Sequence, residues 1–555
     1  MQAVIEVRNL GFTARDTGTR LLDDIQLKIR PGERIGIVGP SGSGKSTLCY
    51  HLVGIHEQAL VGKTEGLILF GGRPYDRYSS LFGQICMLFQ NPENQIFSST
   101  VGDEVMFGLG EKSNGKVTQA LKIVELEGYE QRSIFSLSLG EKQRVIIAAL
   151  LATRPSMLIL DEPTNSLDPP TANRLLDILS KLEIPVILVE HDLERIAGWA
   201  DRVVEMEGGR IIGEGSPDVL FSYSKRKPRA FRLAEILSER YKLEPPSLVP
   251  HRLLKWMDTH QVRLHHISNT PLSPPRSNLL QGFGREILRF EHVDCGYPGK
   301  IPVVSDINLS VHQGEIVALL GLNGTGKTTI LKHVVGLLKP QRGRILIGGE
   351  DIAQQKPEDL FGKVGLVFQN PDYQIFDSTV AAECGFCLKN QKVPKVEIAV
   401  RVKQWLELLG IGALAERNPL TLSYGEKRRL TIASVLVADP ELVAFDEPTT
   451  ALDEDNVTYL REMLLALSRE QGKTFLIATH DLDFALDVAD RILILGEGCV
   501  KVDVPVEELS TQALTNAGFP LPLSTKIAMQ VGLVEQPIGY HRLVEAIRNN
   551  NGKIC

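Results

Sequence analysis

The chain repeats itself, and each copy carries a glycine-rich loop. The segment GPSGSGKST at 39–47 returns as GLNGTGKTT at 321–329, and four further blocks follow both loops in the same order. One domain of roughly 220 residues is therefore present twice, with loops of slightly different length. The matching blocks are FQNPENQIF (89–97) with FQNPDYQIF (368–376), LSLGEKQR (137–144) with LSYGEKRR (422–429), LILDEPTNSLD (158–168) with VAFDEPTTALD (443–453), and His191 with His480.

Within each copy, short β-branched apolar runs alternate with helical patterns. RIGIVG precedes the first glycine-rich loop, STLCYHLVGI follows it, and PVILVEHD comes near the end of the copy. Such alternation predicts an α/β fold with a largely parallel sheet.

Changes in composition predict four regions along the chain. The first domain is expected at 1–222, a linker at 223–285, the second domain at 286–504 and a small helical appendage at 505–555. The linker contains seven prolines, a basic cluster at 225–227 and a helical pattern at 231–241, so we expect a stiff connection with some docked helix. The appendage is expected to have no counterpart after the first copy.

Composition excludes several classes of protein. The 555 residues include 61 basic and 68 acidic side chains, for a net charge of −7, so no bulk basic field is available and no nucleic acid is expected as a partner. No apolar run reaches the ~18 to 20 residues of a membrane-spanning helix. The first ten residues alternate like a strand and do not resemble a signal peptide, which favours the cytosol.

The seven cysteines suit a reducing compartment. Cys384 and Cys387 form the one CxxC motif. A structural zinc site needs four ligands, and no second pair is near in sequence, so buried thiols are favoured over a metal site.

The glycine-rich loops match the pattern G-x-x-x-x-G-K-[ST] between a strand and a helix. Such a loop directs backbone N–H groups and a helix N-terminus at phosphates, while Lys45 or Lys327 adds a positive charge. Ser46 and Thr328 are the expected magnesium ligands of the loops. The residues predicted to bind the nucleotide here are Gly39, Pro40, Ser41, Gly42, Ser43, Gly44, Lys45, Ser46 and Thr47, and Gly321, Leu322, Asn323, Gly324, Thr325, Gly326, Lys327, Thr328 and Thr329.

Acidic pairs end two predicted buried strands. Asp161 and Asp446 would place a carboxylate beside the magnesium, and the next residues, Glu162 and Glu447, can polarise an attacking water. His191 and His480 each leave an apolar strand, which suits a sensor of the γ-phosphate. The alternative for the acidic pairs is a plain strand-end turn. The alternative for the two histidines is a buried structural role.

Together these motifs resemble the nucleotide-binding domains of the ABC ATPase superfamily, over about 440 residues. The resemblance implies two tandem P-loop NTPase domains with helical subdomains, which bind ATP and Mg²⁺ in two composite sites. Each site would combine one domain's glycine loop with the other's LSxGE signature. Site one would contain Lys45, Ser46, Gln90, Asp161, Glu162 and His191 with Ser423 and Gly425; site two would contain Lys327, Thr328, Gln369, Asp446, Glu447 and His480 with Ser138 and Gly140. The metal ligands would be Ser46, Gln90 and Asp161, and Thr328, Gln369 and Asp446.

The sequence departs from the family pattern at two places. The third signature position, normally glycine, is Leu139 or Tyr424, where a side chain would crowd the γ-phosphate, and the fifth is Glu141 or Glu426. The aromatic residue that stacks on adenine corresponds to Tyr297 in the second copy and to Ala14 in the first. Phe12, two residues earlier on the same strand face, is a candidate substitute.

The FQNP-x-x-QIF phrase resembles the energy-coupling-factor (ECF) importer ATPases, and the fused pair resembles the ATPase of hydroxymethylpyrimidine or thiamine-type systems. The resemblance implies a monomeric ATPase unit, peripheral on the cytoplasmic face of the cell membrane, that energises an importer of a vitamin, vitamin precursor or metal ion. Its partners would be integral membrane subunits: a coupling protein and a substrate-binding protein. The alternative is a twin ATPase factor acting on ribosomes, which the proline-rich linker disfavours.

The segment after each Q-loop glutamine, Gln90 or Gln369, is a candidate for gripping a membrane subunit. Phe97 and Phe376 would contact a short helix of that subunit, or they would instead fill the core beneath a surface loop. Asp103, Glu104 and Glu383 would pair with basic residues of the helix, or would only be solvated.

Overall fold

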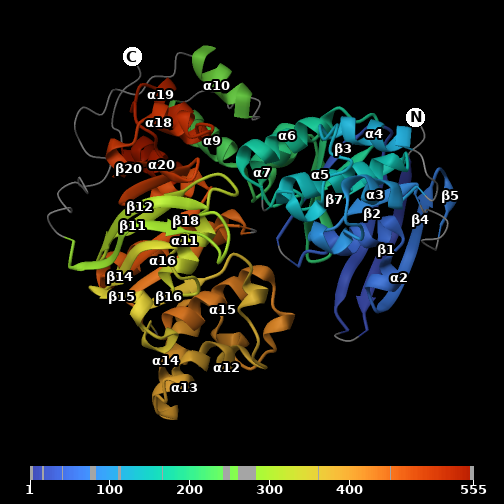
Figure 1. Ribbon diagram of the computed structural model, residues 1–555. Helices are drawn as coiled ribbons and strands as arrows, with labels where there is room; N and C mark the ends of the chain where they lie inside the picture. Colours follow the sequence, from blue (N-terminus) through green and yellow to red (C-terminus); the bar gives the residue numbers. More distant parts are fainter. Residues whose placement is uncertain are drawn as a thin grey trace. The chain divides into compact units, whose positions relative to one another are not determined.

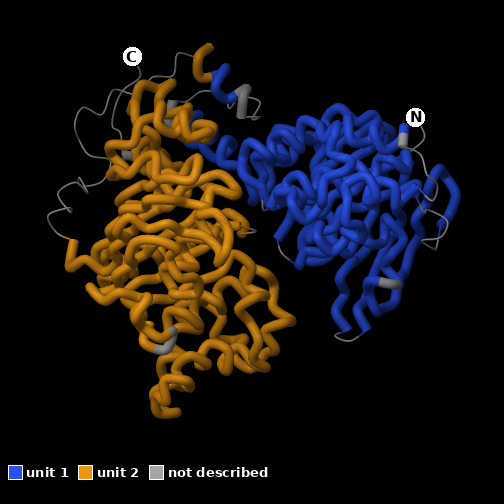
Figure 2. The backbone as a smooth tube through the Cα atoms, viewed as in Figure 1, with its two compact units in different colours: residues 1–256 blue, residues 257–555 orange. Residues whose placement is uncertain are grey.

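The structure is a computed structural model of the chain. It describes residues 4–15, 18–40, 42–75, 83–109, 114–165, 167–241, 250–259, 283–360, 362–450 and 452–549. The chain divides into two compact units, residues 1–256 and 257–555 (Figure 2).

A six-stranded sheet forms the centre of the first unit (Figure 1). The strand order is β10-β9-β3-β8-β7-β6, parallel throughout except for the antiparallel edge strand β10. All residues of β6, β7 and β8 are buried, as expected for apolar runs covered on both faces. The bounds are β3 Arg34–Val38, β6 Ile85–Leu88, β7 Met157–Asp161, β8 Val186–Val189, β9 Arg202–Glu207 and β10 Arg210–Gly215.

A second, antiparallel sheet of four strands has the order β2-β1-β4-β5. Its buried residues alternate along the strands and share one core cluster with helix α1 (Lys45–Val53) and with the central sheet. The strands are β1 Ile5–Ala14, β2 Arg20–Ile29, β4 Gly62–Phe70 and β5 Arg73–Pro74.

The remaining elements of the first unit are helical. After the short helix α2 (His56–Ala59), α3, α4 and α5 form a helical subdomain, and α6 to α9 follow. Helix α5 begins with a complete capping box, in which Ser138 and Glu141 satisfy each other's backbone N–H groups. The bounds are α3 Val101–Phe107, α4 Asn114–Ile123, α5 Leu139–Ala152, α6 Pro169–Ser180, α7 Leu193–Trp199, α8 Pro217–Tyr223 and α9 Arg229–Tyr241, with short 3₁₀ helices at Pro92–Gln95 and Ile134–Ser136.

The second unit repeats this architecture. Its sheets have the orders β16-β17-β18-β13-β19-β20 and β12-β11-β14-β15. The expected α/β fold with two tandem domains and helical subdomains is confirmed. The strands are β11 Glu286–Cys295, β12 Val304–His312, β13 Ile316–Leu320, β14 Arg342–Ile347, β15 Glu350–Asp351, β16 Val364–Val367, β17 Leu442–Asp446, β18 Thr474–Thr479, β19 Arg491–Gly496 and β20 Cys499–Pro505; the helices are α11 Lys327–Val334, α12 Val380–Cys384, α13 Phe386–Asn390, α14 Lys395–Leu408, α15 Tyr424–Leu436, α16 Glu454–Gln471, α17 Leu482–Val488, α18 Thr511–Asn516, α19 Leu523–Gln530 and α20 Tyr540–Asn549.

Helices follow the last strand in both copies. The linker segment contains α9 and α10 (Pro250–Thr259), and α10 crosses the division at 256/257. The tripeptide His-Arg-Leu at 251–253 in α10 returns at 541–543 in α20. The expectation that the appendage has no counterpart after the first copy stays a prediction, although a helix with the same tripeptide follows the first copy. The predicted boundaries at 222, 285 and 504 stay predictions, and 242–249 and 260–282 lie outside the described residues.

Two further observations bear on the expectations from sequence. Among the described helices, none is long and apolar enough to cross a membrane. Cys384 is buried at the end of α12 and Cys387 is partly buried in α13, and both are free thiols. Burial raises the pKa of both thiols, as expected of packed cysteines.

Candidate nucleotide-binding and catalytic site

Each glycine-rich loop joins a buried strand to a helix. In the first unit β3 ends at Val38 and α1 begins at Lys45, with Gly44 at a φ of 97° as its N-cap; in the second unit Gly326 has a φ of 101°. A Cβ on Gly39 would lie 2.1 Å from the Met206 carbonyl oxygen, so only glycine fits there. No acidic residue occupies the first turn of α1 or α11, and both helix N-termini therefore suit an anion.

The loop lysines point back across their own loops. Lys45 Nζ donates to the carbonyl oxygens of Gly39 and Pro40, both at 2.9 Å. Lys327 Nζ donates to Gly321 O at 2.7 Å and lies 3.2 Å from a carboxylate oxygen of Glu447. Both ammonium groups are thus held at the mouth of the loop, where they would contact bound phosphates. Ser41 lies outside the described residues.

The aspartates meet the loop hydroxyl groups, as predicted. Thr328 Oγ1 lies 3.0 and 2.9 Å from the carboxylate oxygens of Asp446, and Ser46 lies close enough to Asp161 for its hydroxyl to lower the pKa of that carboxyl. Burial raises the pKa of both aspartates to about 6. Asp161 Oδ1 is buried without a hydrogen-bond partner. A buried, unsatisfied carboxylate oxygen beside a hydroxyl is a donor set that fits Mg²⁺.

Both candidate catalytic glutamates have a strained backbone. Glu162 has a φ of 52° and Glu447 a φ of 46°, in the left-handed region that side chains rarely adopt. Their amides donate to Val189 O and Ala478 O of the neighbouring strands, which holds this conformation. Strain repeated at the same position of both units is typical of functional sites.

In the first unit three side chains converge on Glu162. His191 Nε2 lies 2.7 Å from Oε1, and Gln90 Nε2 and Asn165 Nδ2 donate to Oε2 at 2.6 and 2.7 Å. Burial acts to raise the pKa of Glu162, but the contact with His191 outweighs it and the net pKa is lowered. The carboxylate is therefore ionised and oriented. Asn165 was not predicted from the sequence, because an asparagine two residues after a proline is not specific to a catalytic site.

In the second unit His480 makes two contacts with Glu447. Its backbone N–H donates to Oε2 at 3.1 Å, and its Nδ1 lies 2.9 Å from the same oxygen. Burial again acts to raise the pKa of Glu447, and the His480 contacts give a net lowering. The structure thus brings together the predicted lysine, aspartate, glutamate and histidine in each unit.

The signature residues Ser138 and Ser423 are N-caps of α5 and α15. Ser138 Oγ accepts from the N–H of Glu141 at 3.3 Å, and Glu141 Oε2 accepts from the Ser138 N–H at 2.8 Å; Ser423 and Glu426 repeat this arrangement. The fifth-position glutamates therefore close the capping box. Gly140 and Gly425 follow in the first helical turns.

Tyr424 does not simply crowd the signature. Its hydroxyl lies 3.1 Å from the carbonyl oxygen of Gln369, so its ring extends toward the Q-loop of its own unit. Leu139 at the equivalent position has no group that could make this bond.

Tyr297 is available for adenine stacking, since it is 36% exposed. Its ring centroid lies 5.7 Å from Lys332 Nζ of α11. The candidate substitute in the first unit is wrong. Phe12 is 2% exposed and packs edge-to-face on His51 at 5.0 Å, because its side chain points into the core between the two sheets. Ala14 offers no ring in its place.

Comparison with known proteins assigns the family. The ABC transporter family model matches residues 22–165 and 304–450. Two relatives, from Methanosarcina mazei and Methanosarcina acetivorans, bear the name "Putative ABC transporter ATP-binding protein". They are 33% and 34% identical over 95% and 92% of this chain, and over 94% and 87% of their own length. The solved structure of cbiO1 from Clostridium perfringens, part of the ABC transporter complex cbiONQ, is 36% identical over 40% of this chain and 88% of its own, with a TM-score of 0.38. The match of the family model and the two Methanosarcina relatives show that the chain belongs to the ABC transporter family, as an ATP-binding protein whose ATPase activity is coupled to transport.

Proposed function

We propose that this protein energises an ECF-type importer of a vitamin, vitamin precursor or metal ion. The observation that carries this proposal is an exposed pair of phenylalanines beside each Q-loop. The substrate would be chosen by separate membrane subunits, a coupling protein and a substrate-binding protein, with the ATPase peripheral at the cytoplasmic face. The twin ATPase factor acting on ribosomes finds no support in the relatives, which are named as transporter components.

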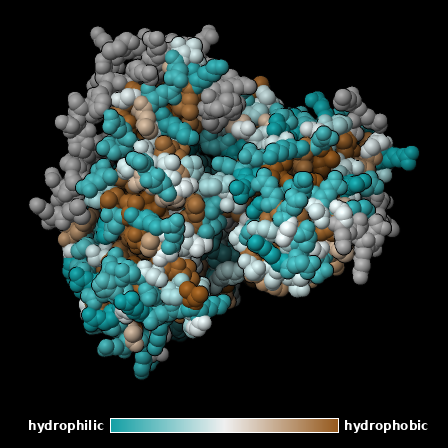
Figure 3. Space-filling model, turned by 45° about the horizontal axis from the view of Figure 1, so that its top comes forward, coloured by the Kyte–Doolittle hydropathy of each residue, from teal (hydrophilic) through white to brown (hydrophobic). Residues whose placement is uncertain are grey.

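The phenylalanine pairs are surface features. Phe97 is 70% exposed and stacks on the ring of Phe107 with centroids 5.3 Å apart. Phe376 is 64% exposed and meets Phe386 edge-on at 4.5 Å. Figure 3 shows several brown, apolar areas on the surface of the molecule. Paired exposed aromatic rings supply the apolar anchor that a short amphipathic helix needs, which favours partner binding over a core role.

The neighbouring glutamates are buried. Glu104 is 4% and Glu383 3% exposed. Each accepts two backbone hydrogen bonds from the phenylalanine loop, so neither prediction for them, pairing with a basic helix or solvation, is correct. They hold the loop in shape. Thr100 is the N-cap of α3, and its hydroxyl donates to the Asp103 carboxylate.

Magnesium would be held by Ser46, Asp161 and Gln90, and by Thr328, Asp446 and Gln369. The bound ion would neutralise charge on the β- and γ-phosphates. Glu162 and Glu447 would accept a proton from the attacking water, while His191 and His480 orient these carboxylates. The two composite sites would pair each of these sets with the signature of the other unit, Ser423 and Gly425 or Ser138 and Gly140.

The first test concerns the membrane partner. Phe97→Ala combined with Phe376→Ala should abolish co-purification of membrane subunits and substrate uptake in cells, while ATP binding by the purified protein is unchanged. Tyr223→Ala, which removes another exposed aromatic ring, is the matched control. Retained co-purification and uptake in the double variant would refute the coupling role.

The second test concerns the catalytic roles. Glu162→Gln combined with Glu447→Gln should slow ATP hydrolysis by about 10² to 10⁴-fold while ATP still binds, since general-base help is worth this much. Hydrolysis at the wild-type rate would show that these glutamates are not the bases.

A further inference from the structure

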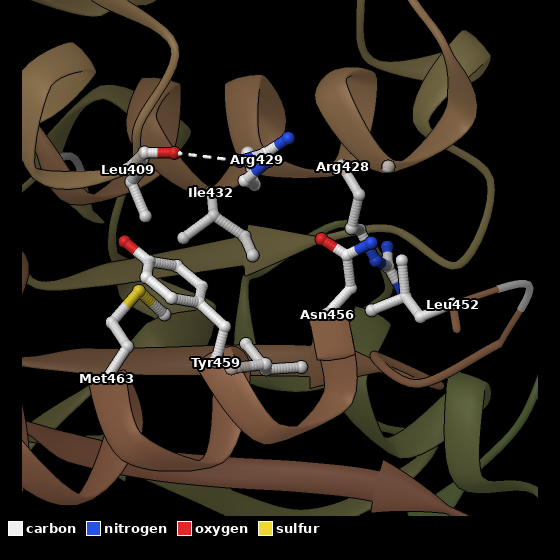
Figure 4. A pocket seen from close by; sticks show the side chains of 10 residues that line it. Leu409, Arg428, Arg429, Ile432, Leu452, Asn456, Tyr459 and Met463 are labelled. Atoms are coloured by element: carbon white, nitrogen blue, oxygen red, sulfur yellow. Dashed lines mark hydrogen bonds between the residues drawn. The ribbon is translucent and has the colours of Figure 1, made fainter. Parts of the chain in front are cut away.

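The second unit contains a fully buried arginine that touches three functional segments. Arg428 lies in α15, one turn after the signature, and is 1% exposed. Figure 4 shows it leaving the helix beside Leu452 and Asn456, at one end of a small pocket between α15 and α16. Its position in the chain gave no reason to single it out.

Every hydrogen bond of the Arg428 guanidinium in the described structure ends on a backbone carbonyl. Nη1 donates to Phe368 O, directly before the Q-loop glutamine. Nη2 donates to Glu447 O at 2.6 Å and to Asp446 O at 3.4 Å, and Nε donates to Pro448 O at 3.3 Å. One rigid planar group thus joins the signature helix, the Q-loop and the strained segment that carries Glu447.

A buried charge with carbonyl partners is costly. No ion pair to a carboxylate is recorded for Arg428 within the described residues, and burial lowers the pKa of its guanidinium. Stability alone favours an apolar side chain at such a position. The guanidinium instead fixes the arrangement of the backbone, because its planar set of N–H donors holds several carbonyl oxygens in place relative to one another.

The first unit lacks this connection. The residue equivalent to Arg428 is Gln143, which is 3% exposed and whose Oε1 is buried without a hydrogen-bond partner. The residue equivalent to Tyr424 is Leu139, so the second bond from α15 to the Q-loop is also missing. The surface pairs Lys142–Glu93 and Lys427–Asp372, at 2.6 and 2.7 Å, occur in both units and do not cause the difference.

The segment after Glu162 is instead held by Glu190, which follows β8. Thr164 donates from its backbone N–H and its hydroxyl to Glu190 Oε1, at 2.9 and 2.7 Å, and Glu190 directly precedes His191. In the second unit the position of Glu190 is occupied by Thr479. The backbone segments after the two catalytic glutamates are therefore braced differently, by Glu190 in the first unit and by Arg428 in the second.

We propose that Arg428 is a positioning residue for ATP hydrolysis: it sets the backbone of Glu447 relative to the Q-loop and the signature helix, and makes the two ATP sites unequal. This inference rests on the proposed catalytic role of Glu447. Movement of the second Q-loop reaches the backbone of Glu447 through Arg428. The first Q-loop instead reaches Glu162 through Gln90, which donates to the carboxylate and not to the backbone.

The experiment measures one site at a time in the full chain. In a Glu162→Gln background turnover reports on Glu447, and in a Glu447→Gln background it reports on Glu162. Arg428→Met in the first background should lower kcat by about 10- to 100-fold, the usual effect of misplacing a catalytic group by about an ångström, with the Kd for ATP unchanged. Gln143→Met in the second background is the matched control and should keep kcat within about twofold.

Arg428→Lys keeps the charge and guards against a folding defect, which a thermal unfolding scan of each variant detects. Lysine cannot span all the carbonyls, so kcat should still fall, by about 5- to 10-fold, at unchanged ATP affinity. Wild-type kcat in the lysine variant, or equal losses from the Arg428 and Gln143 variants, would overturn the proposal. Wild-type hydrolysis by the double glutamine variant would instead refute the catalytic role of the glutamates, so the two failures are distinguishable.

Discussion

The buried carboxylate of Glu104 makes a sharp prediction about the loop that carries Phe97. Its Oε2 accepts from the backbone N–H of Phe97 at 3.0 Å and of Ser98 at 2.7 Å. Hydrogen bonds to a charged group contribute about 1.5–3 kcal/mol each, so the pair is worth about 3–6 kcal/mol. Glu104→Ala should therefore raise the opening equilibrium of this loop by about 10² to 10⁴-fold, at about 1.4 kcal/mol per tenfold change. Glu104→Gln keeps an acceptor oxygen but loses the charge, and should give a smaller increase of about 10- to 100-fold.

Hydrogen exchange followed by mass spectrometry measures this opening on peptides that contain residues 97 and 98. Asp103→Asn is the matched control, because Asp103 lies on the same helix but accepts from the Thr100 hydroxyl, at 2.6 Å, and not from the phenylalanine loop. Exchange in the alanine variant should be faster in this loop and unchanged in the central sheet. Wild-type protection of residues 97 and 98 in the alanine variant would refute the assignment of Glu104 as the support of the loop.

Three further predictions follow from single contacts. Tyr297→Ala should weaken ATP binding by about 1–3 kcal/mol and Ala14→Tyr should strengthen it, by analogy with base stacking, and calorimetry that finds neither change would contradict the stacking role. Burial raises the pKa of Glu190 from 4.5 to about 7, so the folded state holds a proton that the unfolded chain releases. The stability of the first unit should therefore fall as pH rises from about 4.5 to 7. This fall should be smaller in Glu190→Gln, where only the raised pKa of Asp161 still contributes to it, when unfolding temperatures are compared across that range. Asp487 accepts from the N–H groups of His541 and Arg542, the second and third residues of α20, both at 3.0 Å, so Asp487→Ala should increase amide exchange in α20 while α19 keeps its protection better, and wild-type exchange of α20 in this variant would exclude the capping role.

The sequence by itself determined the architecture and most of the site. Motifs spaced alike in two copies required the same strand–loop–helix units twice, and the confirmed fold follows from them. Lys45, Asp161, Glu162 and His191 converge as predicted, because each stands at the carboxyl end of a parallel strand or at the helix that follows. All such ends meet at one edge of the sheet.

Only the tertiary structure decided which side chains face solvent and which brace the site. Phe12 was a candidate for adenine stacking, but strand alternation cannot tell a core between two sheets from an open face. Glu104 reads as a surface charge on an amphipathic helix, and its burial becomes visible only when the phenylalanine loop folds over it. Arg428 and Gln143 look alike as polar residues one turn after a signature. What distinguishes them is the set of backbone carbonyls around them, and those carbonyls come from segments up to 60 residues away that no local pattern brings together.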